Sequence, residues 1–310
     1  KDAAQIAHPV TAMSDDGSAV PAPVLRAVFQ NVKDTGLYLI EHCEHHDTGA
    51  VNEGPVSRAL GVPGIPEDTE LAIVQRDIDL VRETGVHVHF QHVSTAISFD
   101  AIRRAKAEGL PITCETAPHY LALNDEALLK YGTLAKMNPP LRSEQDRQAT
   151  IAAIADGTVD MIATDHAPHT LAEKGLGFLE APNGIIGLEC AFGVCHRILV
   201  DGGYISDERL IELMALNPAS LMGRHSTDIA GLLNTSARCA TTRTLDLAAT
   251  EHPESNDLVI LGLDDEWTVA SDEFKSNARN TPFDGWQVTG RPYATIIGSK
   301  LVFHRLDALH

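Results

Sequence analysis

Short apolar runs alternate with longer helical patterns over the first 222 residues of this chain. The runs at 37–40 and 86–91 are typical of buried strands. The patterns at 69–84 and 98–108 have helical spacing of apolar residues, and each stops at a glycine. Strands and helices that alternate with short connections are the signature of βαβ units. The order of elements therefore predicts an α/β fold with a parallel sheet covered by helices.

The pattern changes after Gly223. It is replaced by short strand-like segments separated by turns, at 257–261, 267–269, 287–289 and 293–297. Such segments predict a small, mostly antiparallel β unit. We therefore expect two domains, a barrel-like domain over residues 1–222 and a small β domain over 223–310. The stretch near 225–255 has poor periodicity and is expected to be a surface insertion or a mobile loop.

Composition restricts the partners rather than the fold. The chain has 310 residues and a net charge of −19, from 24 Lys and Arg against 43 Asp and Glu. An acidic surface of this size disfavours nucleic acid and anionic membranes as partners. No apolar run reaches the ~18 residues of a membrane span, and the opening KDAAQ does not begin a signal peptide. Five widely spaced cysteines without a CxxC motif favour a reducing, cytoplasmic location.

Four strand-like segments, at 10–13, 37–40, 86–91 and 159–162, each lead into a residue of the type that binds metals. These residues are Asp16, His42, His92 and Asp165, the last within the run ATDHAPH at 163–169. In a β/α barrel the C-terminal strand ends converge on one rim, where catalytic groups lie. Two imidazoles and two carboxylates within reach of one another suit zinc, and a carboxylate such as Asp16 can bridge two metal ions.

Each of these residues also has a structural explanation when it is taken alone. Asp16 lies in an Asp-Asp-Gly turn, and a lone histidine such as His42 is more often a hydrogen-bonded core side chain. The metal interpretation depends on all of them occurring together at strand ends. His87 and His89 share one strand face but precede the strand end, so we interpret them as structural.

Seven short motifs follow one another along almost the whole chain. They are SDDG at 14–17, HCE at 42–44, NEG at 52–54, QHVST at 91–95, KMNPPLR at 136–142, DGTVDMIATDHAPH at 156–169 and NTPF at 280–283. In these motifs the chain resembles the bacterial-type (class I) dihydroorotases of the amidohydrolase superfamily. The resemblance implies a distorted TIM (β/α)8 barrel with a small β domain built from both chain ends. It also implies zinc-dependent, reversible cyclisation of N-carbamoyl-L-aspartate to L-dihydroorotate in de novo pyrimidine (UMP) biosynthesis.

The resemblance also gives the metal-type residues their roles. By this resemblance Asp16 bridges or ligates zinc, where relatives use a carboxylated lysine. His42 and His92 ligate the second zinc ion, and Asp165 contacts the first and shuttles a proton. The chemistry fits these residues, because opening a cyclic amide needs an activated water, an electrophile on the carbonyl oxygen and a group that carries a proton to the leaving nitrogen.

Substrate binding is assigned by the same resemblance to Asn138, His169 and the loop with Asn183 and Gly184, whose backbone meets the pyrimidine ring. The implied substrate is a small dianion, which needs cationic or hydrogen-bonding anchors. Arg142 is a further candidate anchor, although a salt bridge at the rim is the interpretation that we favour for it.

Two departures separate this chain from the family pattern. Members open with a strand that carries HxHxR and supplies ligands of the first zinc, whereas this sequence starts at Lys1, downstream of that strand. A barrel takes about 250 residues, so we expect an omitted or cleaved N-terminal part rather than a smaller working barrel. Tyr120, in TAPHY at 116–120, replaces a second histidine and makes this motif more similar to hydantoinases and allantoinases.

Two other functions therefore stay open. One is another cyclic amidohydrolase, such as a hydantoinase or allantoinase, although Asp16, NPPLR and DHAPH speak against it. The other is an inactive dihydroorotase-like scaffold that binds aspartate transcarbamoylase, although the intact candidate ligands argue against loss of activity. A homodimer is the further assembly that we consider.

Overall fold

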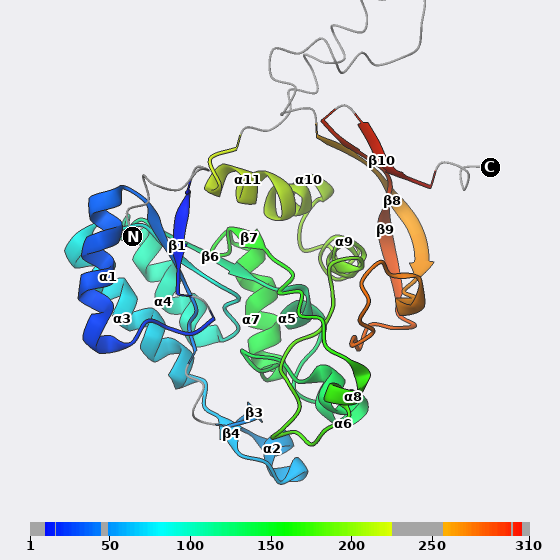
Figure 1. Ribbon diagram of the computed structural model, residues 1–310, viewed down its shortest axis with the longest axis horizontal. Helices are drawn as coiled ribbons and strands as arrows, with labels where there is room; N and C mark the ends of the chain where they lie inside the picture. The colour runs from blue at the N-terminus through cyan, green and yellow to red at the C-terminus, as the bar shows by residue number, and fades with distance from the viewer. Residues whose placement is uncertain (1–9, 16, 45–48, 225–256, 299, 306–310) are drawn as a thin grey trace, which may run out of the picture.

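The computed structural model of the protein describes residues 10–15, 17–44, 49–224, 257–298 and 300–305 (Figure 1). Its main sheet is parallel, with the order β1-β2-β5-β6-β7. The five strands are Ala12–Ser14 (β1), Tyr38–Glu41 (β2), Val88–Phe90 (β5), Ile112–Thr116 (β6) and Met161–Ile162 (β7). The parallel sheet predicted from the alternation of elements is therefore confirmed.

Helices connect the strands and cover the sheet (Figure 1). The long ones are α1 (Ala22–Thr35), α3 (Asp68–Thr84), α4 (Ala96–Ala107) and α7 (Glu144–Ala155). Local signals fix their ends. α3 stops at Gly85, which has a left-handed backbone with φ 72°. The side chains of Thr95 and Ser143 cap α4 and α7 by accepting a hydrogen bond from a backbone N–H of the first turn. These signals explain why the predicted helices agree closely with the observed ones.

Shorter elements lie in the connections. They are α2 (Pro55–Leu60), α5 (Pro118–Ala122), α6 (Ala127–Tyr131), α8 (Leu171–Lys174), α9 (Ala191–Cys195), α10 (Asp207–Ile211), α11 (Asn217–Leu221) and the parallel strand pair β3 (Val51–Asn52) and β4 (Gly64–Ile65). Among the residues described, none of these helices or the longer ones has the length and apolar character of a membrane span.

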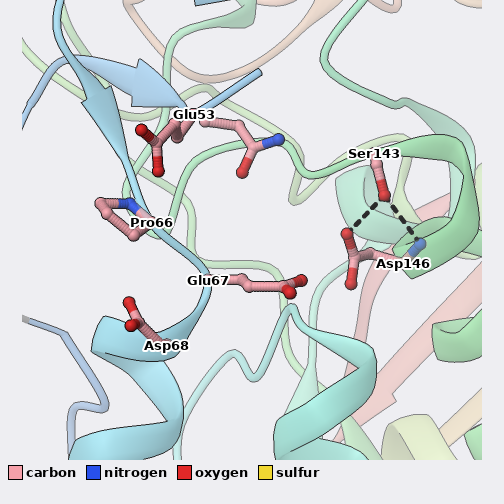
Figure 2. A pocket seen from close by; sticks show the side chains of 7 residues that line it. Glu53, Pro66, Glu67, Asp68, Ser143 and Asp146 are labelled. Carbon is pink, nitrogen blue, oxygen red and sulfur yellow. Dashed lines mark hydrogen bonds between the residues drawn. The ribbon is translucent and has the colours of Figure 1, made fainter.

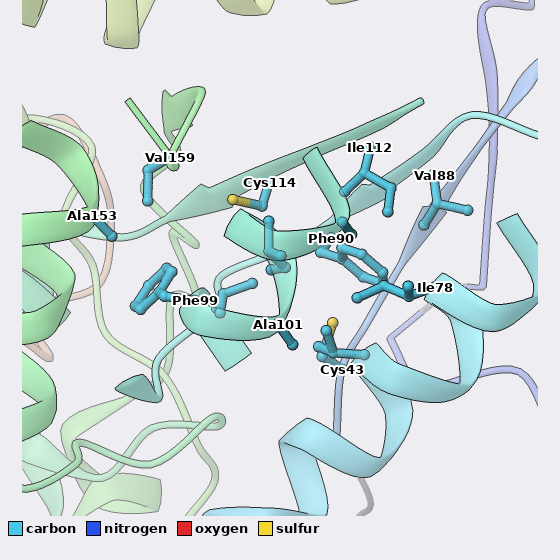
Figure 3. Close-up of a cluster of buried hydrophobic side chains, with 14 of the residues drawn as sticks. Cys43, Ile78, Val88, Phe90, Phe99, Ala101, Ile112, Cys114, Ala153 and Val159 are labelled. Carbon is cyan, nitrogen blue, oxygen red and sulfur yellow. The ribbon is translucent and has the colours of Figure 1, made fainter. Parts of the chain in front are cut away.

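Two buried clusters form the core. In the larger one, side chains of β5 and β6 pack against α3 and α4, with Phe90 and Phe99 fully enclosed (Figure 3). The smaller cluster includes Val194 of α9 and Val288 near the C-terminus. It therefore joins the α/β part of the chain to the C-terminal sheet.

The C-terminal sheet is antiparallel, as predicted, but its strands are longer than expected. It has the order β10-β9-β8, formed by Lys300–His304, Gln287–Ile297 and Leu258–Thr268. The four predicted short strands pair into two continuous ones, because irregular register between Gly262 and Glu266 carries β8 across its polar centre. The predicted insertion near 225–255 lies outside the described residues, and the division into two domains stays a prediction.

Candidate metal centre and substrate site

Three of the four predicted metal ligands lie together, just beyond the C-terminal ends of strands in one sheet. His42 follows β2, His92 follows β5 and Asp165 follows β7. The rings of His42 and His92 meet edge to face, with centroids 4.9 Å apart. Asp165 lies within electrostatic reach of His42. Asp16, the fourth predicted ligand, lies outside the described residues.

The backbone at two of these ligands is strained. The φ angles of His92 and Asp165 are 34° and 47°, and no other non-glycine residue among those described has a positive φ. Left-handed backbone is unfavourable for a residue with a Cβ, and it persists where surrounding contacts impose it, commonly at functional sites. The turns after β5 and β7 therefore store strain at the two residues that the sequence singles out.

Glu70 holds the turn that contains His92. It lies in the first turn of α3 and is buried. Its carboxylate accepts hydrogen bonds from the backbone N–H groups of Ser94 (3.1 Å) and Thr95 (3.0 Å) and from their hydroxyls (2.5 and 2.7 Å). Sequence reasoning misses Glu70, because a glutamate in a first helical turn carries no signal of a partner 24 residues away.

Asp15 orients the ring of His42. One carboxylate oxygen lies 2.5 Å from Nδ1, and the other accepts a hydrogen bond of 2.6 Å from the His42 backbone N–H. Gln91 Nε2 lies 3.0 Å from the same Nδ1, but the carboxylate is closer, so we assign the ring proton to Nδ1. This tautomer leaves the lone pair on Nε2, which is how carboxylates prepare histidines to bind metals. The sequence prediction names Asp16 and omits Asp15, although both belong to the SDDG motif.

His92 has a buried nitrogen without a partner. Its Nδ1 makes no hydrogen bond with any described residue, and its Nε2 lies 3.7 Å from a Glu44 oxygen. Burial, and then the neighbouring His42, lower the pKa of His92 to about 4, so the ring is neutral near pH 7. An unsatisfied buried nitrogen costs about 1–3 kcal/mol, which a metal ion bound there would offset.

Zinc fits this chemistry, since neutral imidazoles with available lone pairs are preferred zinc ligands. The ligand set is incomplete in the part of the chain that the structure describes. No group of three or more His, Cys, Asp or Glu side chains is arranged there to hold a metal ion. The zinc site therefore stays a prediction, supported by the orphaned nitrogen of His92 and the oriented ring of His42.

The pKa of Asp165 suits a group that carries a proton. Burial and then the charge of Glu115 raise its pKa to about 6, while His42 acts in the opposite direction. A carboxyl group with a pKa near the working pH both accepts and returns protons efficiently. The position and the pKa of Asp165 therefore suit the role that the family resemblance implies.

His87 and His89 are engaged by the neighbouring strand. His87 Nε2 and His89 Nδ1 lie 3.0 and 2.9 Å from the hydroxyl of Thr113, and His89 Nε2 lies 3.1 Å from a Glu115 oxygen. These contacts agree with the structural interpretation of both histidines.

Arg142 is not a salt bridge at the rim. It is buried and forms no ion pair with a described residue. Its guanidinium donates instead to the Ser94 hydroxyl (3.2 Å), the Asn52 side-chain oxygen (3.1 Å) and the Ile65 carbonyl (3.1 Å). The burial explains the difference, because an enclosed guanidinium must use its donors on fixed oxygens. Arg142 thus joins the turn after His92 to strands β3 and β4.

The structure brings His169 against the predicted substrate loop. His169 Nε2 lies 2.8 Å from the carbonyl oxygen of Asn183. Gly184 has φ 103°, and a Cβ there would lie 2.4 Å from the Cβ of Ala167, so the close approach requires glycine. Asn280, from the NTPF motif, donates to the carbonyls of Ala167 (3.0 Å) and Gly184 (3.2 Å). The motif therefore fastens the loop to the segment that follows Asp165.

Asn138 lies in a segment held by Tyr120. The Tyr120 hydroxyl donates to the carbonyl of Pro139 at 2.6 Å, and the Asn138–Pro139 peptide is cis. The segment also reaches the substrate loop, because the Gly184 N–H donates to the Lys136 carbonyl at 3.0 Å. The tyrosine that departs from the family pattern therefore has a structural role next to a predicted substrate residue.

A cavity of about 410 Å³ lies beside the N-termini of α3 and α7 (Figure 2). It is lined by Asn52, Glu53, Pro66, Glu67, Asp68, Ser143 and Asp146. None of the predicted site residues lines it, and its acidic lining disfavours an anionic ligand.

Comparison with known proteins agrees with the resemblance read from the motifs. Residues 4–229 match the family described as "Amidohydrolase family". The dihydroorotase of Geobacter metallireducens is 40% identical over 298 residues, which are 95% of this chain and 65% of that protein. The dihydroorotase of Lactiplantibacillus plantarum is 42% identical over 298 residues, 94% of this chain and 64% of that protein. The chain thus spans about 65% of the length of the relatives it matches.

Solved structures support the barrel-type fold. An L-hydantoinase (dihydropyrimidinase) from Arthrobacter aurescens superposes with a TM-score of 0.72 at 27% identity, covering 95% of this chain and 64% of that one. A D-hydantoinase from Thermus sp. gives a TM-score of 0.69 at 23% identity, over 92% of this chain and 61% of that one, which supports the fold alone. The expected α/β barrel type with a small C-terminal β sheet is confirmed, and the chain belongs to the amidohydrolase family.

Proposed function

We propose that this chain is part of a zinc-dependent dihydroorotase, which interconverts N-carbamoyl-L-aspartate and L-dihydroorotate in pyrimidine biosynthesis. The observation that carries the proposal is identity of about 40% to dihydroorotases along nearly the whole chain. His42, His92 and Asp165 support it, because they lie together at strand ends with the chemistry that the reaction needs.

In this proposal His42 and His92 hold zinc, with Asp16 as a further ligand. Zinc, when bound, supplies a Lewis acid that activates water and polarises the amide carbonyl. Asp165 takes a proton from the attacking water and returns it to the ring nitrogen as the amide bond breaks. Asp15 keeps the His42 ring in the tautomer with its lone pair on Nε2.

The substrate is bound in this proposal by hydrogen-bonding groups. Asn138 and His169 anchor it, and the backbone at Asn183 and Gly184 meets the ring. The hydrogen bonds that fasten this loop to the 165–169 segment support the assignment, because they fix the loop relative to Asp165. We also infer a cytoplasmic location, and a homodimer or a complex with aspartate transcarbamoylase as the assembly.

A hydantoinase-like activity is the second candidate. Tyr120 departs from the dihydroorotase pattern, and the L-hydantoinase from Arthrobacter aurescens has a similar structure. The lower identity of that protein, 27% against 40%, favours dihydroorotase.

The test uses protein expressed from the complete gene. Dihydroorotate and N-carbamoyl-L-aspartate are assayed in both directions beside hydantoin and allantoin, and bound zinc is measured by elemental analysis. We expect turnover of the first pair only, lost with chelator and restored by zinc. Turnover of hydantoin without turnover of dihydroorotate would contradict the proposal and favour the hydantoinase-like activity. Absence of both metal and turnover would instead favour a scaffold that partners aspartate transcarbamoylase.

A further inference from the structure

Two buried lysines hold the loop at 181–184. Lys174, the last residue of α8, donates from Nζ to the carbonyl oxygens of Lys136 (3.1 Å), Pro182 (2.9 Å) and Gly184 (3.0 Å). Lys136 donates from its own Nζ to the Ala181 carbonyl at 2.6 Å. Lys174 is only 2% exposed and Lys136 only 5%. All the hydrogen-bond acceptors that the described residues give these ammonium groups are backbone carbonyls.

Anchoring of the 181–184 loop does not by itself explain why the buried side chain at position 174 is a charged one. Burial, and then the charge of Lys136, lower the pKa of Lys174 to about 8, so enclosing the ammonium is unfavourable. A neutral side chain shares one of these anchoring contacts, since the amide of Asn280 also donates to the Gly184 carbonyl, at 3.2 Å. Anchoring alone therefore does not require a charged group.

The peptide between Pro182 and Asn183 gives such an explanation. In a trans peptide the C=O and the N–H point in opposite directions. Because the Pro182 carbonyl faces Lys174, the Asn183 N–H points away from the ammonium. Asn183 is exposed, and its N–H donates to no acceptor among the described residues. An ammonium on the carbonyl polarises the peptide and strengthens that N–H as a donor.

We propose that Lys174 is a positioning residue, whose ammonium fixes and polarises the Pro182–Asn183 peptide so that the Asn183 N–H binds a negatively polarised oxygen of the substrate. The inference deepens the proposed function and rests on it for the identity of the substrate. It assigns to Lys174 an effect on substrate affinity that is separate from its effect on stability.

Lys136 provides a matched control. Its ammonium is similarly buried and bonds the same loop. Its acceptor, the Ala181 carbonyl, belongs to a peptide whose nitrogen is that of Pro182 and carries no N–H. Removing this ammonium loosens the loop, but it weakens no N–H donor, because the Ala181–Pro182 peptide has none.

The experiment compares Lys174→Met with Lys136→Met in protein from the complete gene, by dihydroorotate kinetics and thermal unfolding. Both variants are expected to melt at a lower temperature than the parent protein. Lys174→Met alone is expected to raise KM by about tenfold while kcat changes by less than about threefold, because a hydrogen bond made equally in ground and transition states affects binding only. An equal rise of KM in both variants would overturn the proposal.

A second measurement needs no turnover. In protein labelled with ¹⁵N-asparagine, the Asn183 amide proton is expected to move upfield in Lys174→Met and to stay in place in Lys136→Met. An unchanged Asn183 resonance overturns the polarisation of the peptide, whatever the substrate is. The expected shift in a protein that does not turn over dihydroorotate would instead leave the positioning role standing and remove the proposed function.

Lys174→Met removes one donor from each of three carbonyls and leaves the Pro182 carbonyl with no donor among the described residues, so its folding is checked first. If it does not fold, Lys174→Gln takes its place, because the amide keeps N–H donors and removes the charge. The same criteria for KM and for the Asn183 resonance then apply. Loss of folding in both variants would overturn the proposal, since the ammonium would then serve the fold as a whole.

Discussion

Asp15 contacts His42 twice, through the ring Nδ1 at 2.5 Å and through the backbone N–H at 2.6 Å. The two residues follow the neighbouring strands β1 and β2, so this carboxylate ties a predicted zinc ligand to the edge of the main sheet. It fixes both where the imidazole lies and which nitrogen carries the proton.

Asp15→Asn is expected to weaken zinc binding by about 10–100-fold, because the neutral amide no longer favours the required tautomer of His42. Competition with a chromophoric chelator measures the affinity. The exposed Asp79, which pairs with Arg82, gives the matched control Asp79→Asn. Equal zinc affinity in the two variants would contradict the orienting role of Asp15.

Asp165→Asn is expected to lower kcat by about 10²–10⁴-fold, because an amide neither accepts nor returns the proton. Asparagine tolerates left-handed backbone, so this variant keeps the turn with φ 47°. Asp165→Ala should also abolish turnover, and in addition lose stability by about 1 kcal/mol relative to Asp165→Asn through backbone strain. Kinetics and urea unfolding of the two variants separate the chemical effect from the conformational one.

His119 is expected to make the protein sensitive to acid. It is buried, and burial and then His92 lower its pKa to about 3. The proton therefore binds the unfolded chain more tightly, so the contribution of His119 to stability is present above about pH 6.5 and is lost as the pH falls toward 3. Between pH 7 and pH 5 this loss amounts to about 2 kcal/mol.

His119→Phe tests this expectation, because phenylalanine keeps an aromatic ring beside Tyr120 and does not titrate. Urea unfolding at pH 7 and pH 5 should show a smaller loss of stability in the variant than in the parent protein. His304→Gln, at an exposed site, should keep the parent dependence. Equal losses in the parent protein and in His119→Phe would sink the prediction.

Tyr120→Phe is expected to cost about 1–3 kcal/mol of stability, because it leaves the Pro139 carbonyl buried without its donor. The same change should raise KM for dihydroorotate, since the hydroxyl holds the segment that contains Asn138. Thermal unfolding and steady-state kinetics measure the two effects. A stable variant with unaltered KM would show that the hydroxyl neither supports the fold nor positions Asn138.

The sequence predicts those parts of the molecule that depend on local pattern. Apolar spacing and glycine stops give α3 and α4, and the position of His42, His92 and Asp165 after strands gives most of the candidate site. The parallel order of the strands then brings these residues to one edge, as the barrel geometry requires.

Partners that are distant in the sequence are harder to predict. Glu70 reaches Ser94, and Lys174 reaches three carbonyls on two segments, with no spacing rule to indicate either contact. Asn280 lies in a recognised motif, but its role emerges only when the chain brings it beside Ala167. The long strand β8 is also missed, because its polar centre looks like a turn although pairing with β9 continues on both sides.

The left-handed conformation at His92 and Asp165 restricts which amino acids these two positions accept, independently of any ligand chemistry. If both positions were randomised and variants were selected for altered metal preference, the main-chain conformation would first exclude amino acids that do not adopt a left-handed backbone. Asparagine, aspartate, histidine and glycine would be accepted more readily than valine, isoleucine or threonine. Redesign of the centre would therefore have to begin with the two turns and only afterwards choose the donor atoms.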